Sequence, residues 1–479
     1  MDHLLMKLRA FVQRRKMEKL AAVPIEYEDD TYRLLFAESG EEAGEIVLDV
    51  NGRLKKFVEF DEKRLFVVKS KEELCRIVER FLEEIFPDSI QKLHLSSIVD
   101  VDDFYIFDYV QKDDKLGLSL PNSGVSFSIS INGIILDMTN ELGNVKAVYP
   151  EELLTEQDAM ELYLKALKPQ LKIMQYDQEM YIRGNNEFKL VYDFLNTAAL
   201  DVKMDGALTN LEDLGMETYE YGSLPQLPIA ETSIYRTVGA ETMQKILTAD
   251  SDQGKVEVWS HLPAGHLFSE YEDTDLLDLD IGIEHVIKMA FDCEDGKLNR
   301  MITVIDENRD RNRVSEAVAY EAALRILFNQ FPEAHRVFKL RIEEAGLIEY
   351  EDEEITPFAF QFNFVRFENG IQVEGCEVSI TICAATGELC EWCVWGEVNQ
   401  DYKTLTGAET ASVEEAMKLY ESAFFMKLNW AKEEGEGDDP YYELVYLPEF
   451  QDSGGTIHCI DAETLEPWIV DSSSLEEFE

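Results

Sequence analysis

Cysteine and histidine side chains are the groups in this sequence that could most readily do chemistry, and few are spaced for it. Cys390 and Cys393 have the Cys-x-x-Cys spacing of redox and zinc sites, which place this motif at a helix start or a tight knuckle. Residues 389–395 alternate as a strand, where positions three apart point to opposite faces. We therefore expect no local chelation or oxidation by this pair. Cys383 and Cys390 could instead face each other across a turn and form a disulfide on oxidation.

The histidines are scattered along the chain. His261 and His266 are five residues apart, which does not fit the i, i+4 metal pair of a helix, and the sequence has no His-Glu-x-x-His motif. His458, beside Cys459, fits a terminal strand better than a metal site. The sequence therefore predicts no histidine-based metal centre.

The acidic runs do not form a calcium loop. In residues 273–280, Leu276 and Leu277 occupy positions where such a loop needs ligands, so we interpret the run as a solvated edge. The sequence contains no Gly-x-Ser-x-Gly elbow, no P-loop and no Gly-x-Gly-x-x-Gly motif. Our prediction is no catalytic, cofactor-binding or metal-binding residues, no cofactor and no enzymatic activity.

Composition describes a folded, strongly acidic protein. The 479 residues are 45% hydrophobic, enough for more than one packed core, and 97 acidic against 44 basic residues give a net charge of −53. Such a charge repels nucleic acid and anionic membranes and favours either solubility or a basic partner. Residues 433–439 form the main continuous acidic block and resemble a loop.

The location that we expect is the cytoplasm. The seven cysteines are an odd number without regular spacing, which favours free thiols in a reducing compartment. Residues 1–22 form a basic amphipathic pattern that lacks a signal-peptide core, and no run is long enough to span a membrane. This segment could lie on an anionic membrane, but docking onto the protein's own acidic body is the simpler interpretation.

Short motifs recur in the same order in the two parts of the chain, which indicates a tandem duplication. The matched stretches are 17–20 with 243–246, 51–54 with 295–298, 86–88 with 331–333, 158–163 with 415–420, 190–192 with 444–446, and 204–208 with 460–465. The offset between copies grows from 245 at Phe86 and Phe331 to 257 at Asp158 and Glu415. This growth predicts an insertion of about a dozen residues in the central sheet of the second copy.

Amphipathic helices are predicted at residues 71–86, 155–167, 315–331 and 412–428. Ser70 with Glu73 forms a capping box, Thr155 and Ser412 precede similar patterns, and the helix after Ser315 lacks one. The stripe of the third helix is predicted to include Ala317, Tyr320, Leu324, Leu327, Phe328 and Phe331.

An antiparallel meander is predicted over residues 357–395. Phe358, Phe360, Phe362 and Phe364 alternate with smaller or polar residues, and Asn369-Gly370 is the typical sequence of a two-residue hairpin turn. The strand at 375–382 resembles the stretch 124–131 of the first copy.

We predict an α+β fold in which each unit is a helix packed on an antiparallel sheet. Each half contains two such units, in domains of residues 1–230 and 231–479. The linker is predicted at residues 222–228, where two prolines lie close together, so the boundary falls near residue 230.

The turn motifs resemble the YcdB/YcdC repeated domain of Firmicute bacteria, a relative of the PepSY domain. Arg366, Asn369-Gly370-Ile371 and residues 386–389 follow that family's pattern, and residues 460–465 look like a further copy with Leu465 in place of the glycine. The resemblance implies tandem PepSY-like units and a non-enzymatic role. PepSY domains occur in protease propeptides, where they are thought to inhibit or chaperone.

Three functions therefore stay open. The first is a non-catalytic protein-binding or regulatory protein of PepSY-like type that could modulate a protease. The second is an acidic electrostatic decoy for a basic-surfaced protein, and the third is an uncharacterised enzyme. A protein partner is expected and nucleic acid is not, while the identity of the partner and the oligomeric state are left open.

Overall fold

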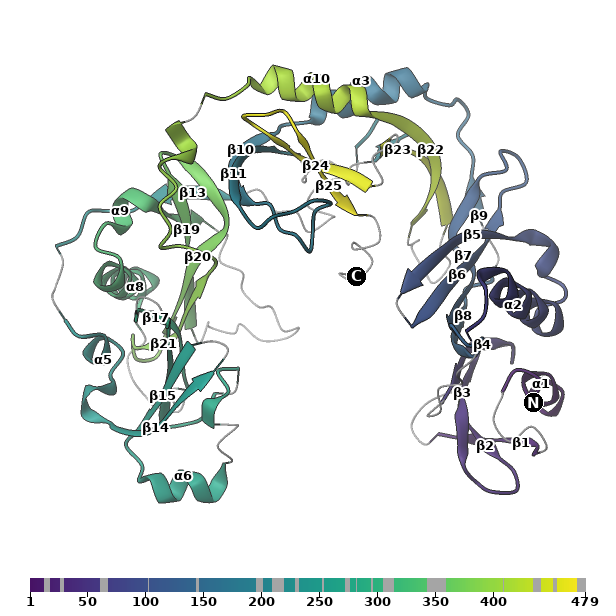
Figure 1. Cartoon of the computed structure of the whole chain (residues 1–479), viewed down its shortest axis with the longest axis horizontal. Coiled ribbons are helices and arrows are strands. Elements are labelled where there is room, and N and C mark those ends of the chain that lie inside the picture. Colours follow the sequence, from purple (N-terminus) through teal and green to yellow (C-terminus); the bar gives the residue numbers. More distant parts are fainter. Residues whose placement is uncertain are drawn as a thin grey trace.

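The protein forms an arch of two similar helix-and-sheet units joined by a central unit (Figure 1). The computed structural model describes residues 1–12, 18–25, 30–60, 68–101, 103–143, 146–194, 201–208, 219–228, 232–251, 254–271, 276–280, 282–293, 296–304, 314–342, 359–407, 409–433, 441–450 and 455–471. The first unit is the right arm in Figure 1 and the second is the left arm.

The first repeat is a helix on an eight-stranded antiparallel sheet. Its elements are α1 (Asp2–Leu8), β1 (Leu20–Pro24), β2 (Thr31–Phe36), β3 (Glu42–Leu48), β4 (Leu54–Glu59), α2 (Lys71–Ile85), η1 (Ile90–Lys92), β5 (Leu93–Val101), β6 (Phe104–Lys112), β7 (Ser119–Ser130) and β8 (Ile135–Asn140). The predicted capping box starts α2, and Leu74, Val78 and Phe81 bury its apolar stripe against the sheet. Leu5 and Leu8 of α1 join the same core, so intramolecular docking of the N-terminal segment is confirmed, although α1 is short.

The second repeat is built in the same way. Its elements are β13 (Glu220–Ser223), α5 (Ile234–Thr237), η2 (Ala240–Thr242), β14 (Gln244–Ser251), β15 (Gly254–Ser260), α6 (Ala264–Glu270), β16 (Val286–Phe291), β17 (Leu298–Thr303), α8 (Glu316–Gln330), α9 (Ala334–Val337), β18 (Phe338–Ile342), β19 (Ala359–Glu368), β20 (Ile371–Cys383) and β21 (Leu389–Trp395). Asn369 and Gly370 both have positive φ, at 48° and 86°, which confirms the predicted hairpin turn between β19 and β20.

The strand order of the two repeats confirms the duplication. The first sheet runs β1-β2-β3-β4-β8-β7-β6-β5, and the second runs β14-β15-β16-β17-β21-β20-β19-β18, with the long helix after the fourth strand in each. An equivalent bond ties each helix to its sheet, because Lys69 N donates to Ile131 O and Val314 N donates to Ala384 O. These bonds set an offset of 253 between β7 and β20, from residue 131 to residue 384, which corrects the alignment of residues 124–131 with 375–382 by two positions.

Two insertions distinguish the second repeat. Two residues, 102 and 103, connect β5 to β6 in the first repeat. The equivalent connection between β18 and β19 spans residues 343–358, which the structure does not describe. The predicted insertion in the sheet therefore lies between β18 and β19. A second insertion, which the sequence motifs did not indicate, lies between β15 and β16, where α6 and residues 276–280 and 282–283 cover the outer end of the sheet with their own small core.

The central unit interlocks the two copies. Its elements are β9 (Lys146–Val148), α3 (Glu156–Ala166), β10 (Gln170–Gln175), β11 (Phe188–Asp193), β12 (Val202–Lys203), η3 (Leu405–Gly407), α10 (Val413–Ala423), β22 (Phe424–Glu433), β23 (Tyr441–Phe450), β24 (Gly455–Asp461) and β25 (Pro467–Asp471). In one sheet the β10–β11 hairpin pairs with β20 on one side and with β24 on the other. In the other sheet β9 and β12 pair with β23. Strands from before residue 219 thus complete sheets formed by later strands.

Equivalent tyrosines hold the interlocked copies together. Tyr163 of α3 and Tyr420 of α10 have their hydroxyls 3.1 Å apart, and they occupy matched positions of the duplicated motif. Tyr192 donates to Ala411 O at 2.8 Å just before α10. Its counterpart Tyr446 donates to Leu154 O at 3.1 Å just before α3. Each copy therefore anchors the helix of the other, and α3 and α10 lie side by side over the top of the arch (Figure 1).

Several predicted boundaries need correction. The proposed division at residue 230 lies outside the described residues, and domains 1–230 and 231–479 share a sheet. The predicted linker at 222–228 begins inside β13, which pairs with β18. The helix predicted over 412–428 ends at Ala423, because Phe424 begins β22. Ala317 is exposed rather than part of the α8 stripe.

Some predicted features fall on residues that the structure does not describe: Met17, Phe358, residues 434–439 of the acidic block, and residues 273–275 of the acidic run. Within the described residues, no helix combines the length and the apolar character needed to cross a membrane.

Candidate functional site

The face of the first repeat's sheet that α2 leaves uncovered carries one polar row of side chains and one mixed row. Strand pairing places residues in register across this open face. One row consists of Lys56, Thr139, Ser126, Asp108 and Ser97, and the next of Val58, Asp137, Ser128, Ile106 and Val99. All ten are half-buried or exposed. Ser97 Oγ donates to Asp108 Oδ2 at 2.7 Å, so part of this polar surface is already ordered.

The second repeat has an open face of the same kind. Its rows consist of Arg300, Cys393, Ser379 and Asn363, and of Ile302, Glu391, Thr381 and Gln361. Cys393 and Asn363 are buried, and the other six are half-buried or exposed. Arg300 Nη2 contacts Asp280 Oδ1 at 2.6 Å, which ties this face to the segment that covers its outer end.

At six of eight equivalent positions, the two open faces carry related side chains. Lys56 corresponds to Arg300, Ser126 to Ser379, Asp108 to Asn363, Val58 to Ile302, Asp137 to Glu391 and Ser128 to Thr381. The other two positions differ, since Thr139 corresponds to the buried Cys393 and Ile106 to Gln361. The covered faces match as well: Phe107 and Phe362, Val125 and Val378, and Ile129 and Ile382 are identical, whereas Phe57, Met138 and Phe127 are replaced by Met301, Trp392 and Ile380. Packing under a helix accounts for the apolar match, but an exposed position tolerates most polar residues, so packing does not account for related polar groups on the open faces. The matched open faces are therefore the strongest candidate for a shared function.

Both open faces lie on the inner side of the arch, since α2 and α8 lie on its outer flanks (Figure 1). The helices α3 and α10 likewise lie above the central sheets. The open faces named above therefore line the inside of the arch from both arms.

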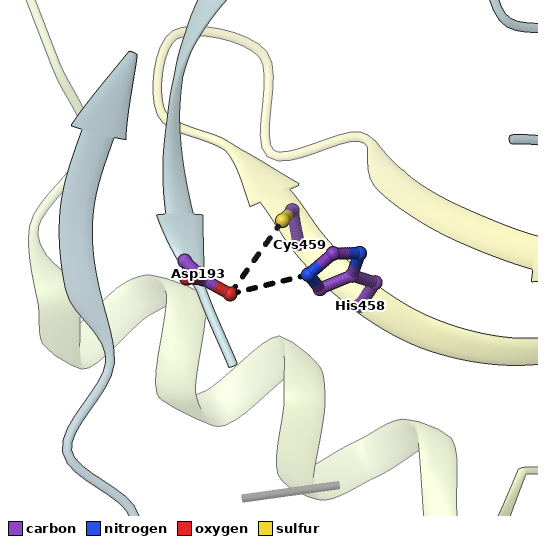
Figure 2. A group of neighbouring side chains, drawn as sticks. All are labelled: Asp193, His458 and Cys459. Atoms are coloured by element: carbon purple, nitrogen blue, oxygen red, sulfur yellow. Dashed lines mark hydrogen bonds and ion pairs between the residues drawn. The ribbon is translucent and has the colours of Figure 1, made fainter. Parts of the chain in front are cut away.

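A second candidate is a buried polar cluster in the central unit, made of Asp193 on β11 and His458 and Cys459 on β24 (Figure 2). Their ligand-type atoms lie within 4.8 Å of one another. Asp193 Oδ1 is 3.3 Å from His458 Nε2 and 3.9 Å from Cys459 Sγ. All three side chains are buried, with Cys459 fully enclosed. The cluster joins a strand of each copy.

Lys172 supplies the positive charge that balances this cluster. Its Nζ lies 2.7 Å from Asp193 Oδ2 and 2.9 Å from Glu374 Oε2. Burial alone would raise the pKa of Asp193, but His458 and Lys172 together hold it well below its usual range. Burial, reinforced by the charge of Asp193, raises the pKa of the Cys459 thiol well above its usual range. At neutral pH the cluster thus contains a carboxylate and a protonated thiol.

The Cys-x-x-Cys pair lies on β21, where the sequence placed it. Burial raises the pKa of Cys390 to about 12 and that of Cys393 to about 11, so neither thiol is activated. Cys383 is a close neighbour of Cys390, as predicted, and both are free thiols.

The remaining motif residues lie apart from both candidate sites. His266 lies on α6, where it has no counterpart in the first repeat. Arg366, from the family pattern, is buried and donates to Val398 O at 3.3 Å and to Glu368 Oε2 at 3.0 Å, so it ties strand ends together. The sequence placed His458 and Cys459 in a terminal strand correctly, but it gave no reason to bring Asp193 beside them.

Comparison with known proteins identifies the repeated unit. Residues 14–139 and 241–394 match the family described as the YcdB, YcdC repeated domain, and these two stretches coincide with the two repeats. The chain is 26% identical over 414 residues to the uncharacterized protein YcdB of Bacillus subtilis (strain 168), which covers 82% of this chain and 83% of that protein. It is 24% identical over 352 residues to the uncharacterized protein YcdC of the same organism, covering 71% of this chain and 72% of that one. Among solved structures, the C-terminal domain of Bacillus megaterium YpeB matches with a TM-score of 0.27 and 17% identity over 40% of this chain and 85% of that one.

Proposed function

Because this chain belongs to the family of the YcdB, YcdC repeated domain and contains that unit twice, we propose that it is a non-catalytic protein-binding or regulatory protein. In this proposal the two open faces form its binding surface. The observation that supports it is the matched polar chemistry of the two faces on the inner side of one arch. Both copies have kept hydroxyl groups, a cation and acidic or amide groups at equivalent exposed or half-buried positions, which is expected if both faces bind similar groups of a partner.

The chemistry of the open faces favours a basic partner rich in hydrogen-bond donors. Hydroxyl and carboxylate groups such as Ser128 and Asp137 accept hydrogen bonds, as do their counterparts Thr381 and Glu391. The net charge of −53 attracts a positively charged surface over long range and speeds its encounter. Lysine, arginine and backbone amide groups of a partner protein are the complementary chemistry.

A PepSY-like mode of action suggests the class of partner. PepSY-related units are associated with proteases, so a peptidase or a protease precursor is the partner class that we propose to test first. In such a complex the protein acts by occupying the partner rather than by performing a reaction. The protease proposal has a separate test. Increasing amounts of this protein are added to the purified partner, and the peptidase activity of the partner is measured.

Substitutions on the open faces provide the test of the binding proposal. Ser128→Arg and Thr381→Arg each place a long cation at the centre of one face, where it clashes with a bound partner and repels a basic one. We expect either variant to lower partner recovery about tenfold, a loss of about 1.4 kcal/mol. The measurement is a quantitative pull-down from lysate of the native host, at low and high salt, read by mass spectrometry.

Ser422→Arg is the matched control. Ser422 is exposed on α10, on the outer side of the arch, and the substitution makes the same change of side chain and charge. Recovery by this variant should equal that of the wild type. Equal recovery by all four proteins at both salt concentrations would refute the open faces as the binding surface. Loss of recovery in high salt alone would favour the electrostatic decoy instead.

A further inference from the structure

We propose that Asp193, His458 and Cys459 form a structural zinc site that fastens the two copies of the central unit. The proposal is independent of the partner-binding function and rests on the geometry of this cluster. Aspartate, histidine and cysteine each supply a ligand atom that Zn²⁺ commonly takes. The three donors converge from β11 and β24, which belong to different copies (Figure 2).

A β-bulge brings two neighbouring residues to one point. Consecutive side chains of a regular strand point to opposite faces, which would separate His458 from Cys459. The pairing of β24 with β25 shifts register between Ile457 and Cys459, so His458 is the extra residue of the bulge. Both side chains consequently point toward Asp193 (Figure 2). Bulges often occur where a strand must redirect a side chain, as a ligand set requires.

The imidazole is already oriented as a metal ligand. His458 Nδ1 is 2.7 Å from the hydroxyl of Tyr181, and such a contact on the second ring nitrogen fixes the orientation of metal-bound histidines. Nε2 lies 3.3 Å from Asp193 Oδ1, an ion-pair contact whose geometry is poor for a hydrogen bond, and the side chain is only 2% exposed. A metal ion bound to both atoms would replace this weak contact with two ligand bonds.

The donor separations suit a tetrahedral ion. Zinc bonds of 2.0–2.3 Å at tetrahedral angles place neighbouring ligand atoms about 3.3–3.8 Å apart. The separations of 3.3 Å for Nε2 to Oδ1 and 3.9 Å for Sγ to Oδ1 are close to these values, and the third pair, Nε2 and Sγ, lies within 4.8 Å. Met174 Sδ, 3.6 Å from Cys459 Sγ, borders the cluster with a thioether. The three donors fill three of the four positions of a tetrahedral zinc ion, and the apolar walls of Tyr176, Val191 and Trp468 enclose the fourth, which a water molecule would take.

Lys172 leaves one carboxylate oxygen of Asp193 to face the cluster. Its Nζ contacts Oδ2, whereas Oδ1 lies beside His458 and Cys459. On zinc binding a Zn–S bond forms and the thiol proton leaves to solvent.

The test uses the full chain, freed of metal with EDTA and dialysed. On addition of Zn²⁺ we expect one ion per chain by elemental analysis and a rise in Tm. On addition of Co²⁺ as a spectroscopic probe we expect a thiolate-to-cobalt charge-transfer band that saturates at one equivalent. Absence of this band in the wild-type protein together with an unchanged Tm would overturn the proposal.

Cys459→Ser and His458→Gln are the test variants, and Cys376→Ser is the control because Cys376 is also buried but lies outside the cluster. Cys459→Ser should lose the charge-transfer band, and both test variants should lose the Tm rise with Zn²⁺. Cys376→Ser should keep both signals. A band that persists in Cys459→Ser would place the metal elsewhere and contradict the site. If Cys459→Ser fails to fold, His458→Gln decides, since it must weaken cobalt binding at least tenfold.

Discussion

Replacing Asp113 with alanine is expected to lower the free energy of unfolding by about 3 kcal/mol, because one carboxylate serves five donors where the first repeat meets the central unit. The donors are Lys115 N at 2.9 Å, Leu116 N at 2.7 Å, Leu118 N at 2.8 Å, the Tyr149 hydroxyl at 2.9 Å and Trp430 Nε1 at 3.2 Å. Three of them close the turn between β6 and β7, and the other two belong to the central unit. The substitution therefore loosens the turn and the joint together.

The effect of Asp113 depends on pH in a defined direction. Burial raises its pKa, but the hydrogen bonds from Leu116, Trp430, Leu118 and Tyr149 outweigh burial and lower the pKa to about 2 from an ordinary value of 3.8. A depressed pKa stabilises the fold above the unfolded-state value and loses this contribution as pH falls toward the folded-state value. The difference in free energy of unfolding between wild type and Asp113→Ala should therefore be largest above about pH 4 and decrease as the pH falls toward about 2.

Urea denaturation followed by tryptophan fluorescence measures this difference. Asp114→Ala is the matched control, because Asp114 is the adjacent, exposed carboxylate. The control should change stability by less than about 0.5 kcal/mol. Equal effects of the two substitutions, or a difference that does not vary between pH 2 and pH 5, would contradict the role of Asp113.

Replacing Lys172 with methionine is expected to cost about 3–5 kcal/mol, the range for a buried ion pair that loses one partner. Lys172 is 8% exposed, and its removal leaves Asp193 charged and buried without its cation. The double variant Lys172→Met with Asp193→Leu removes both charges and should recover most of the loss. Thermal unfolding of Lys172→Met, Asp193→Leu and the double variant gives the coupling free energy between the two residues.

The control for this substitution is Lys427→Met. Lys427 pairs with Glu449 at 2.8 Å, but both side chains are about half exposed, at 50% and 43%. Solvent screens such a pair, so its loss should cost less than about 1 kcal/mol. A double variant of Lys172 and Asp193 no more stable than Lys172→Met would show that burial of the ion pair is not the source of the effect.

Local patterns in the sequence predicted much of each repeat. The capping box at Ser70 starts α2, the Asn369-Gly370 turn joins β19 to β20, and the duplicated motif around Tyr163 and Tyr420 is real. These features depend on neighbouring residues, whose propensities and turn chemistry act over a few positions. Strand alternation also placed Cys390 and Cys393 on one strand, and both lie on β21, where burial raises the pKa of each thiol.

Those local patterns could not predict which strands pair across the two copies. The parallel pairing of Lys172 with Gln372 and the antiparallel pairing of Asp193 with Cys459 join strands of different copies, and neither strand's sequence specifies its partner. The alternation rule that excluded one cysteine pair would also separate His458 from Cys459, and a single bulge reverses that result. Recognition of the matched open faces likewise requires the register between strands, which the structure supplies.

Carboxylate footprinting of the complex tests the matched open faces most directly. Asp137 and Glu391 occupy equivalent positions on the two faces, whereas Glu83 on α2 and Glu421 on α10 are exposed on the helices that lie on the outer side. Carbodiimide labelling, with and without the partner recovered by pull-down, is read residue by residue by mass spectrometry. We predict that the partner lowers labelling of Asp137 and Glu391 together and leaves Glu83 and Glu421 unchanged. Protection of the helix residues, with Asp137 and Glu391 still labelled, would contradict a binding surface formed by the two open faces.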